Sequence, residues 1–433
     1  MNKFIFIIKY YAYFNFIKLI VFFNFKFLFY LINLLFIFYI NTKKKKSIIY
    51  LSRSIFNEDI KNLINIENNF NFIKINSLTY TFLFTAIFKN EVFREDIVEN
   101  YLRYNDDKFI QLRKTYFDYL SIIFKIYKKQ YNCKLIIAGN FIYTRNYEIF
   151  EVCKSLKIKS IILHKEGIAL PNKNNIDKMT SSVSKSILNA DYIFFYNNMI
   201  YKSYLQYDDN NINEDNSFIF GIPRFDDYII NKNKFNSSNN NCVVFFAFNP
   251  IANFKLQFND HSNLKKIEEI TNEFYKNLFN YFKINKNYNL IIKSKLGDEH
   301  ANYLNDQLKL HGFSSIPSNF TISNHVPAKT LLKKSNFIIS CYSTVLIEAA
   351  ILEKNILTLD YQKIGVNLDY FVNFQKLAFY YNKYEDFNYF LNNSQNKLSN
   401  NREYLHKFVK QFSNNGLNPV SNKILKKIKE LMT

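Results

Sequence analysis

Residues that could bind a phosphorylated nucleotide are concentrated between positions 325 and 360. A short apolar run, Phe337–Ser340, reads as a buried strand, and the turn Cys-Tyr-Ser-Thr follows it before a new apolar helix begins. The free N–H groups of a helix that starts at the carboxyl end of a parallel strand attract anions. We therefore expect Ser343 and Thr344 to contact an anion such as a nucleotide diphosphate, and Glu348, one turn into the helix, to accept a hydrogen bond from a ribose or sugar hydroxyl.

The same residues also have a purely structural interpretation. Ser343 and Thr344 are ordinary helix-capping residues, and an acid in a first helical turn is stabilised by the helix dipole without any ligand. The sequence alone leaves both interpretations open.

Two lysines end another predicted strand of the second half of the chain. In Leu290–Lys295 the apolar run stops at Lys293-Ser-Lys295. An ammonium group at the carboxyl end of a strand is suited to a phosphate, so Lys293 and Lys295 are further candidates for donor binding.

Titratable groups also end a strand of the first half. The run Ile161-Ile-Leu is followed by His164-Lys-Glu166-Gly. A histidine titrates near neutral pH, so His164 is a candidate general base, with Glu166 as its partner. A histidine at a strand end is also often only hydrogen-bonded to its loop, and that alternative stays open.

Three more polar residues follow predicted strand ends or the turn between the two halves of the chain. Asn140 and Asn249 each follow a buried strand, and Arg224 lies in Gly-Ile-Pro-Arg-Phe-Asp, residues 221–226. We expect these three residues to line the cleft or its hinge. Their alternative interpretation is that of ordinary loop and turn residues.

The elements that must position these residues alternate between short apolar strands and helix-length segments. This pattern is typical of parallel sheets covered by helices. The first half contains six such strands, and the second half contains four. The predicted strands are 48–51, 72–75, 134–138, 160–163, 192–195, 218–220, 242–246, 290–293, 337–340 and 356–359.

A linker rich in Asn, Ser and Lys at 231–241 separates the two alternations. We therefore predict an α/β protein with two Rossmann-like domains facing a cleft. The expected domains are an acceptor domain at 47–230 and a nucleotide-donor domain at 242–378, followed by closing helices at 379–433. Residues 1–46 are expected to form an apolar, membrane-associating helical segment.

The composition excludes several classes of protein. The net charge is +21 and the chain has seven glycines and four cysteines. No Cys-x-x-Cys pair, P-loop, dinucleotide-binding fingerprint or zinc-finger spacing occurs, so we expect no metal and no cofactor. The basic residues are dispersed rather than gathered on one recognition helix, which argues against nucleic acid as a partner. An anionic membrane surface or a phosphorylated substrate remains.

The N-terminal segment 4–40 is almost wholly apolar but is interrupted by Lys9, Lys18 and Lys26. It either spans a membrane, lies in the interface or packs as a helix of the soluble protein. The cationic run Lys43–Lys46 is expected to lie on the cytoplasmic side. The segment therefore predicts a protein associated with the cytoplasmic face of the inner, or plasma, membrane.

The order of the motifs resembles GT-B transferases of surface polysaccharide biosynthesis. The Ser-Thr-x-Leu-x-Glu-Ala pattern at 343–349 resembles the donor motif of CDP-glycerol glycerophosphotransferase-like and capsule biosynthesis glycosyltransferase-like proteins. The segment at 221–226 resembles their Gly-x-Pro-Arg-x-Asp segment. Lys293-Ser-Lys295 stands where they have Lys-x-His-Pro, so an imidazole is missing there.

This resemblance implies a transferase that moves a sugar or glycerol-phosphate group from a CDP-, UDP- or CMP-linked donor to a saccharide or lipid-linked acceptor. Two alternatives share the paired-domain fold. One is an enzyme like the sugar-nucleotide 2-epimerases, and the other is a non-catalytic polysaccharide assembly protein.

Overall fold

The computed structural model describes residues 3–30, 46–52, 54–67, 69–88, 98–165, 186–235, 241–251, 261–295, 297–313, 315–341, 343–361, 377–392 and 402–432. The chain divides into two compact units. Of the described residues, unit 1 holds those up to 165, those from 186 to Arg224, and 420–432. Unit 2 holds those from Phe225 to Pro419.

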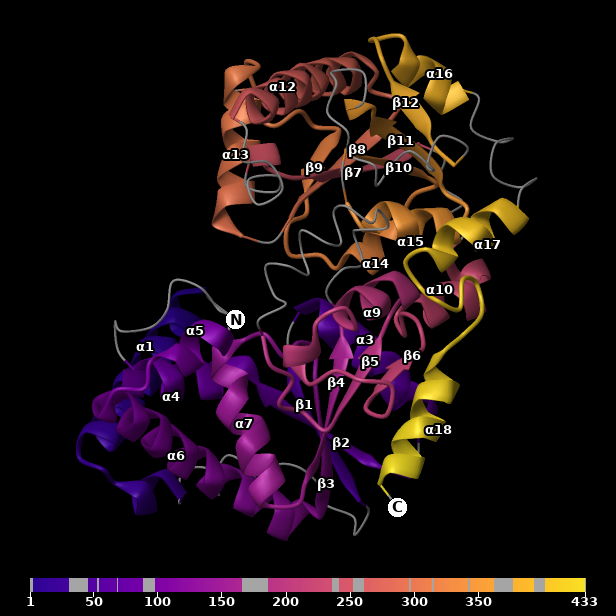
Figure 1. The fold of residues 1–433 in the computed structure, drawn as a ribbon. Coiled ribbons are helices and arrows are strands. Elements are labelled where there is room, and N and C mark those ends of the chain that lie inside the picture. The colour runs from indigo at the N-terminus through magenta and orange to yellow at the C-terminus, as the bar shows by residue number, and fades with distance from the viewer. Residues whose placement is uncertain are drawn as a thin grey trace. The chain divides into compact units, whose positions relative to one another are not determined.

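Unit 1 is built on a six-stranded sheet in the order β2-β1-β3-β4-β5-β6, in which all neighbours are parallel (Figure 1). Its strands are runs of Ile, Leu and Phe that are largely buried, as expected for a parallel sheet. The strands are β1 (Ser47–Ser52), β2 (Asn71–Asn76), β3 (Cys133–Ala138), β4 (Lys159–His164), β5 (Tyr192–Phe195) and β6 (Ser217–Ile219).

Several helices of unit 1 precede β3 in the sequence. The longest of these helices is α6. Its N-cap residue is Asp106, whose side chain accepts a hydrogen bond from Phe109 N at 2.6 Å, and its C-cap residue is Asn132, in the left-handed conformation. The helices are α1 (Lys3–Phe22), α3 (Ser54–Ile66), α4 (Ser77–Phe88), α5 (Val98–Arg103), α6 (Asp107–Tyr131), α7 (Thr144–Ser155), α9 (Asn198–Tyr204), the 3-10 helix η2 (Asp208–Asn210) and α18 (Ser421–Leu431).

Unit 2 holds a second parallel sheet of six strands in the order β12-β11-β10-β7-β8-β9. The strands are β7 (Cys242–Ala247), β8 (Asn289–Ser294), β9 (Phe320–Ile322), β10 (Phe337–Ser340), β11 (Asn355–Leu359) and β12 (Phe379–Tyr381). The helices are α10 (Phe225–Ile230), η3 (Lys232–Phe235), α12 (His261–Ile284), α13 (Asp298–Leu310), α14 (Ala328–Leu332), α15 (Val345–Ile351), α16 (Asp386–Asn392) and α17 (Arg402–Lys410).

The predicted class of fold is confirmed: the chain forms two consecutive Rossmann-like α/β units, and every predicted strand is present within two residues at each end. Two edge strands differ from the expectation. β9 was not predicted, and β12 begins the region predicted to be helical only, because Phe379–Tyr381 pairs with β11 at the sheet edge.

The C-terminal helix α18 belongs to unit 1, although the sequence analysis groups it with the closing helices that follow the second domain. Lys429 Nζ of α18 lies 2.7 Å from Glu67 Oε2, and Lys427 Nζ lies 4.3 Å from the ring centroid of Phe218. The chain therefore returns to its first unit at the end, a long-range contact that local sequence patterns do not encode.

The N-terminal helix α1 packs on unit 1. Ile17 and Ile20 are buried, and the Phe14 ring lies 5.3 Å from that of Phe82 in α4. Tyr119 of α6 donates a hydrogen bond to the Ile20 carbonyl at 3.2 Å. Among the described residues, no helix combines the length and the apolar character that crossing a bilayer requires.

Buried Lys354 links η3, near the start of unit 2, to the residue that precedes strand β10. Its Nζ donates to Asn336 Oδ1 at 3.0 Å and to the Phe235 carbonyl. Burial lowers the pKa of Lys354 to about 8. Between about pH 8 and the ordinary lysine value, the unfolded chain binds more protons than the folded chain, so Lys354 makes stability rise with pH across that window.

We predict that this rise disappears in Lys354→Met. The free energy of unfolding of the wild type relative to the variant should increase by about 1.5 kcal/mol between pH 8 and pH 9.5. The difference between the two proteins is measured because buried tyrosines, which ionise at higher pH, make the stability of both proteins fall as the pH rises. Urea titrations of both proteins across this range measure it, with exposed Lys309→Met as the control. A difference that does not change with pH would contradict the lowered pKa.

Candidate functional site

The strand order of unit 2 defines one point where a ligand-binding crevice is expected. From β7 the chain proceeds to β8 and β9 on one side, whereas β10, β11 and β12 follow on the other side. The carboxyl ends of β7 and β10 are therefore neighbours at the reversal of strand order, and Phe246 pairs with Ser340 in the register. Ligands of open α/β sheets bind at such switch points. The loops after β7 and β10 carry Asn249, Ser343 and Thr344.

The turn after β10 leads directly into α15. The N–H groups of Leu346 and Ile347 donate to the carbonyls of Ser343 and Thr344 at 3.0 and 3.1 Å. Ser343 Oγ accepts from Val345 N at 3.4 Å, which is a long hydrogen bond, and Thr344 makes no side-chain cap. Ser343 and Thr344 are half-buried. The structure thus places both hydroxyls at the start of α15, with only a weak capping role for Ser343.

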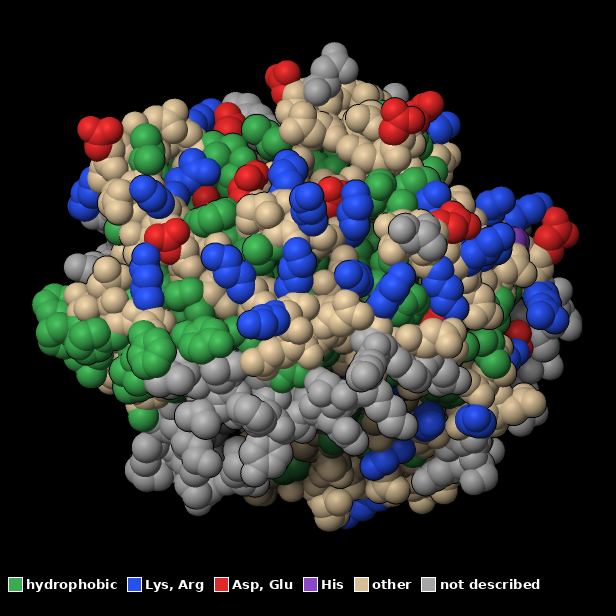
Figure 2. Space-filling model, turned by 90° about the horizontal axis from the view of Figure 1, so that it is seen from below, with side chains coloured by type: hydrophobic (Ala, Val, Ile, Leu, Met, Phe, Trp, Pro, Cys, Tyr) green, Lys and Arg blue, Asp and Glu red, His purple; other side chains and the backbone are tan. Residues whose placement is uncertain are grey.

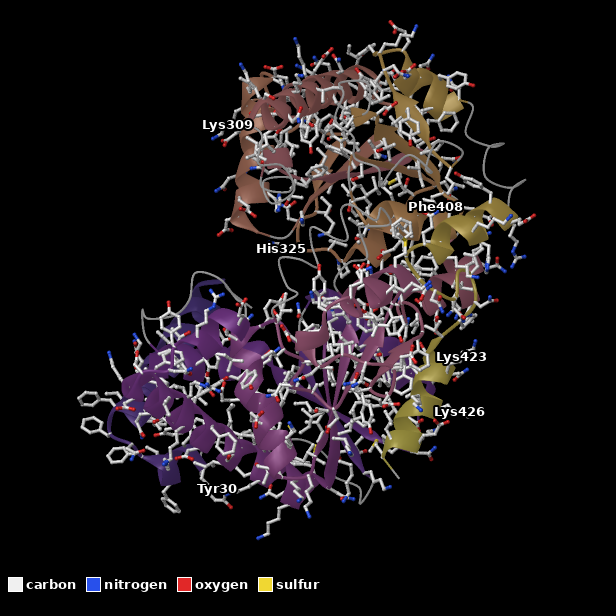
Figure 3. The ribbon with its side chains drawn as sticks, in the orientation of Figure 1. Tyr30, Lys309, His325, Phe408, Lys423 and Lys426 are labelled. Atoms are coloured by element: carbon white, nitrogen blue, oxygen red, sulfur yellow. The ribbon has the colours of Figure 1, made fainter. Side chains whose placement is uncertain are left out.

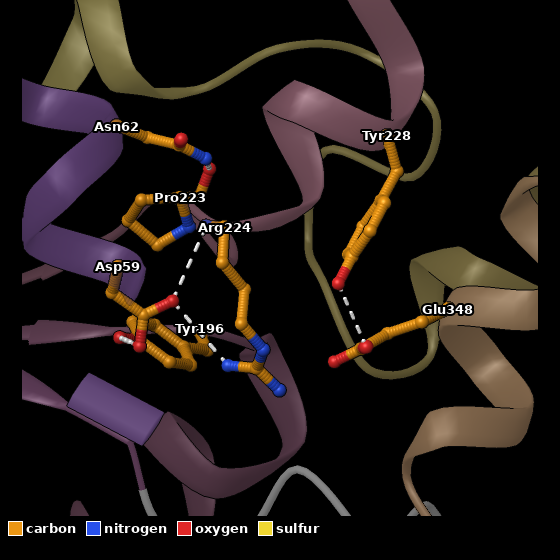
Figure 4. A network of polar contacts seen from close by, with 7 residues as sticks. All are labelled: Asp59, Asn62, Tyr196, Pro223, Arg224, Tyr228 and Glu348. Carbon is orange, nitrogen blue, oxygen red and sulfur yellow. Dashed lines mark hydrogen bonds and ion pairs between the residues drawn. The ribbon is translucent and has the colours of Figure 1, made fainter. Parts of the chain in front are cut away.

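Glu348 is buried within α15 and accepts a hydrogen bond from Tyr228 of α10. The Tyr228 hydroxyl lies 2.9 Å from Glu348 Oε2 (Figure 4). α10 begins in the Gly-x-Pro-Arg-x-Asp segment, and Lys329 of α14 forms an ion pair with Asp227 of the same helix. Glu348 therefore also holds α10 on unit 2, a role that its position in a first helical turn did not reveal.

The loop after β7 is held by side chains from two helices. Tyr275 of α12 donates to the Phe248 carbonyl and accepts from Phe248 N, both at 3.0 Å. His300 of α13 accepts from Asn249 N at 3.0 Å through Nδ1. These contacts fix the backbone on one side of the switch point.

His300 is a residue that sequence reasoning missed. Its ring is buried, and Nδ1 accepts, so the proton of the neutral ring is on Nε2, which lies 3.5 Å from Glu299 Oε1. Burial and the nearby charge of Lys295 lower the pKa of His300, while Glu299 opposes them. His300 is therefore neutral at pH 7. His300 lies in the first turn of α13, the helix that follows β8, and this position was the sequence signal that could have identified it.

The two predicted lysines differ in their surroundings. Lys293 is half-buried and its Nζ donates to the Asn324 carbonyl at 2.8 Å, while the Asn324 side chain accepts from Ser294 N. Burial lowers the pKa of Lys293. Lys295 is exposed and its backbone N–H donates to the Ala247 carbonyl of β7. Both lysines lie at the carboxyl end of β8, next to β7, and their role in phosphate binding stays a prediction.

In unit 1 the strand order reverses between β1 and β3, and the predicted acceptor residues lie near this point. Asn140 follows β3 and is buried; its Oδ1 accepts from Ile142 N at 2.8 Å, and its carbonyl accepts from Asn146. Gly139, beside it, leaves little room for a side chain, since a Cβ would lie 3.0 Å from the Phe56 ring. Asn140 therefore shapes the turn after β3.

His164 ends β4 and is 1% exposed. Its ring centroid lies 5.4 Å from those of Phe195 and Tyr204 and 5.8 Å from that of Phe141. A base must reach its substrate, so the catalytic role of His164 requires that this aromatic cluster open. Its proposed partner, Glu166, lies outside the described residues. The roles of both residues stay predictions.

Arg224 lies in a buried polar network of unit 1 (Figure 4). Its NH1 lies 3.3 Å from Asp59 Oδ1, which also accepts from Arg224 N. Tyr196 donates to Asp59 Oδ2 at 2.8 Å. Asn62, one turn after Asp59, donates to the Pro223 carbonyl at 2.7 Å. The segment that ends unit 1 is thus fixed to α3, and the cleft or hinge role of Arg224 stays a prediction.

A cavity of unit 2 is not part of this site. A cavity of about 320 Å³ lies at the outer edge of the second sheet, lined by residues of β11, β12 and α16 that include Phe379, Asn382 and Tyr389. Within the described part of the chain, no group of three or more His, Cys, Asp or Glu side chains is arranged to hold a metal ion.

Comparisons with known proteins find structures with low sequence identity. The chain is similar to the UDP-GlcNAc 2-epimerase from Methanocaldococcus jannaschii, with 13% identity, 89% of this chain and 99% of that one covered, and a TM-score of 0.48. The Neisseria meningitidis UDP-GlcNAc 2-epimerase has 12% identity, with 89% of this chain and 100% of that one covered, and a TM-score of 0.45. The wall teichoic acid polymerase TagF has 13% identity, with 90% of this chain and 90% of that one covered, and a TM-score of 0.45.

No protein-family model and no curated protein sequence matches the chain. The similar structures include a teichoic acid polymerase, the kind of protein that the sequence motifs resemble, and 2-epimerases, which the sequence analysis keeps as an alternative. With TM-scores below 0.5, these similarities decide neither the fold nor the activity. The fold follows from the strand order, and the activity is a matter of proposal.

Proposed function

We propose that the protein is a transferase that moves a sugar or glycerol-phosphate group from a nucleotide-activated donor to a cell-surface polysaccharide acceptor. The observation that supports this proposal is the switch point of the second sheet, where the loop of Asn249 and the turn of Ser343 and Thr344 follow neighbouring strands. A CDP-, UDP- or CMP-linked donor would bind there. The acceptor would bind at unit 1.

In this proposal Ser343 and Thr344 contact the phosphates of the donor. Lys293 and Lys295, at the end of the adjacent strand β8, stabilise the negative charge that develops on the departing nucleotide. Glu348 orients a donor hydroxyl, and a base in unit 1, for which His164 is the candidate, removes the proton of the acceptor hydroxyl.

Incubation of the protein with labelled CDP-, UDP- and CMP-linked donors, with and without membrane extracts that supply acceptors, tests this function. We expect label to appear in a polymer or lipid fraction only when an acceptor is present. Conversion of a UDP-sugar to its epimer without acceptor would favour the epimerase alternative. Nucleotide binding without any turnover would favour the assembly protein.

The role of Glu348 can be separated from its contact with Tyr228. Glu348→Gln is expected to weaken binding of the intact donor by about 1.5 to 3 kcal/mol, because a hydrogen bond to a charged group is replaced by a neutral one. Tyr228→Phe removes the contact with α10 but leaves the carboxylate, so it should cost about 1 kcal/mol of stability with little change in donor affinity. Calorimetric titration of both variants measures these effects.

Equal losses of donor affinity in the two variants would mean that Glu348 acts only through α10. Donor affinity unchanged in Glu348→Gln would remove this residue from the proposed site altogether. Denaturation of each variant in urea provides the stability values needed to interpret the titrations.

A further inference from the structure

A group of large hydrophobic side chains is exposed at the end of α1 and in the segment that follows it. Phe22 and Phe27 are 80% and 74% exposed. We call this group the aromatic cap; its members are Phe16, Leu19, Phe22, Phe23, Phe25, Phe27, Leu28 and Tyr30. Figure 3 shows Tyr30 in this region of unit 1, where rings project outward from the ribbon. Contiguous apolar patches of this kind mark surfaces that bind a partner or a membrane.

The aromatic cap is held in place by the opposite side of the same segment. Ile17, Ile20 and Phe29 are 1% exposed, and the rings of Phe29 and Tyr119 lie 5.0 Å apart in an edge-to-face arrangement. The Phe25 N–H donates to the Ile20 carbonyl at 2.9 Å across the turn that follows α1. The cap residues therefore face solvent because the fold of unit 1 orients them outward.

The helix α6, which contacts the cap segment through Asp118, carries exposed basic side chains. Lys26, within the cap segment, forms an ion pair with Asp118 of α6 at 2.8 Å. At 3.6 residues per turn, Lys114, Lys125 and Lys129 lie within about 40° of Asp118 on the same face of α6. All three lysines are exposed. Figure 2 shows hydrophobic side chains gathered at one edge of a face that is crossed by a row of lysine and arginine side chains.

We propose that the aromatic cap inserts into the headgroup region of an anionic lipid bilayer, with the lysines of α6 facing the lipid phosphates. Aromatic rings partition into the interface, and each lysine near an anionic surface adds attraction. The cationic surroundings disfavour a second copy of this chain as the occupant, because the same positive charges would meet across the interface. The cap thus acts as a rigid interfacial contact formed by folded unit 1.

Flotation of the full-length protein with phosphatidylcholine vesicles, with and without phosphatidylglycerol, tests this proposal. We expect binding to the vesicles that contain phosphatidylglycerol, and weakening of this binding by salt. The double variant Phe22→Ser/Phe27→Ser should weaken it by roughly 10- to 100-fold, because two exposed rings no longer enter the interface. The variant Lys114→Glu/Lys125→Glu should weaken it by at least about tenfold.

Matched controls lie on unit 2. Ile284 and Leu310 are 72% and 69% exposed, so Ile284→Ser/Leu310→Ser removes comparable apolar surface elsewhere, and Lys286→Glu/Lys309→Glu makes the same charge change. Both control variants should bind vesicles like the wild type. The proposal is overturned if the Phe22/Phe27 variant binds like the wild type, or if the wild type does not bind. It is also overturned if the cap variant abolishes a dimer, seen by sedimentation, while vesicle binding is unchanged.

Discussion

Replacement of Asp59 by Asn is expected to destabilise unit 1 by about 3 to 5 kcal/mol. Asp59 is fully buried, and removing its charge breaks its ion pair with the buried guanidinium of Arg224. The variant also weakens the hydrogen bond that Tyr196 donates. Asn preserves the size of the side chain, so the loss reports the charge rather than a cavity.

The two units need not unfold together, so the effect should be followed in unit 1 itself. Amide hydrogen exchange of peptides from α3 and β5 during urea titration measures it. Glu430→Gln in α18, which belongs to the same unit, is the control: exposed Glu430 lies 3.3 Å from Lys427 Nζ, and loss of this ion pair should cost less than about 1 kcal/mol. An Asp59→Asn variant as stable as this control would show that the buried pair does not support unit 1.

The second large effect is expected at His300, which we assign a positioning role at the switch point of unit 2. His300→Leu should cost about 1 kcal/mol or more of stability, because the part-buried N–H of Asn249 loses its acceptor. Nucleotide affinity should fall by about tenfold or more, since the loop after β7 is no longer fixed. His300→Asn keeps an acceptor near the position of Nδ1 and should retain much of both.

The pH dependence distinguishes this role from simple packing. Because the pKa of folded His300 is lowered, the unfolded chain binds more protons below about pH 6.5. The stability that neutral His300 contributes is therefore fully present above that pH and is lost as the pH falls toward the folded pKa. Urea titrations from pH 7.5 to pH 5 should show a larger loss in the wild type than in His300→Asn, because His311, whose pKa is also lowered by burial, contributes to both proteins. The same loss in both proteins would assign it to another group.

The strands could be predicted because each is a short run of β-branched or aromatic residues between polar segments. The two that were missed, β9 and β12, are three-residue edge strands, and such short runs are not distinguishable from loop or helix segments by periodicity. The turn at Ser343 was predicted correctly in position because a strand must end and a helix begin there.

The contacts of the candidate residues could not be predicted, because they join segments far apart in the chain. Glu348 meets Tyr228, 120 residues away, and Arg224 meets Asp59, 165 residues away. The burial of His164 among aromatic rings depends in the same way on Tyr204, which lies in helix α9. Local spacing reveals which residue types end a strand, but not which distant side chain they will contact.

Amide hydrogen exchange with and without saturating CDP, UDP or CMP tests the central claim most directly, because it locates the bound nucleotide along the chain. The account predicts that at least one of these nucleotides slows exchange in peptides that cover Phe248–Asn249 and Ser343–Ile347, at the carboxyl ends of β7 and β10. Slowed exchange confined to the strand ends of unit 1, or nucleotide binding without any change at β7 and β10, would contradict it.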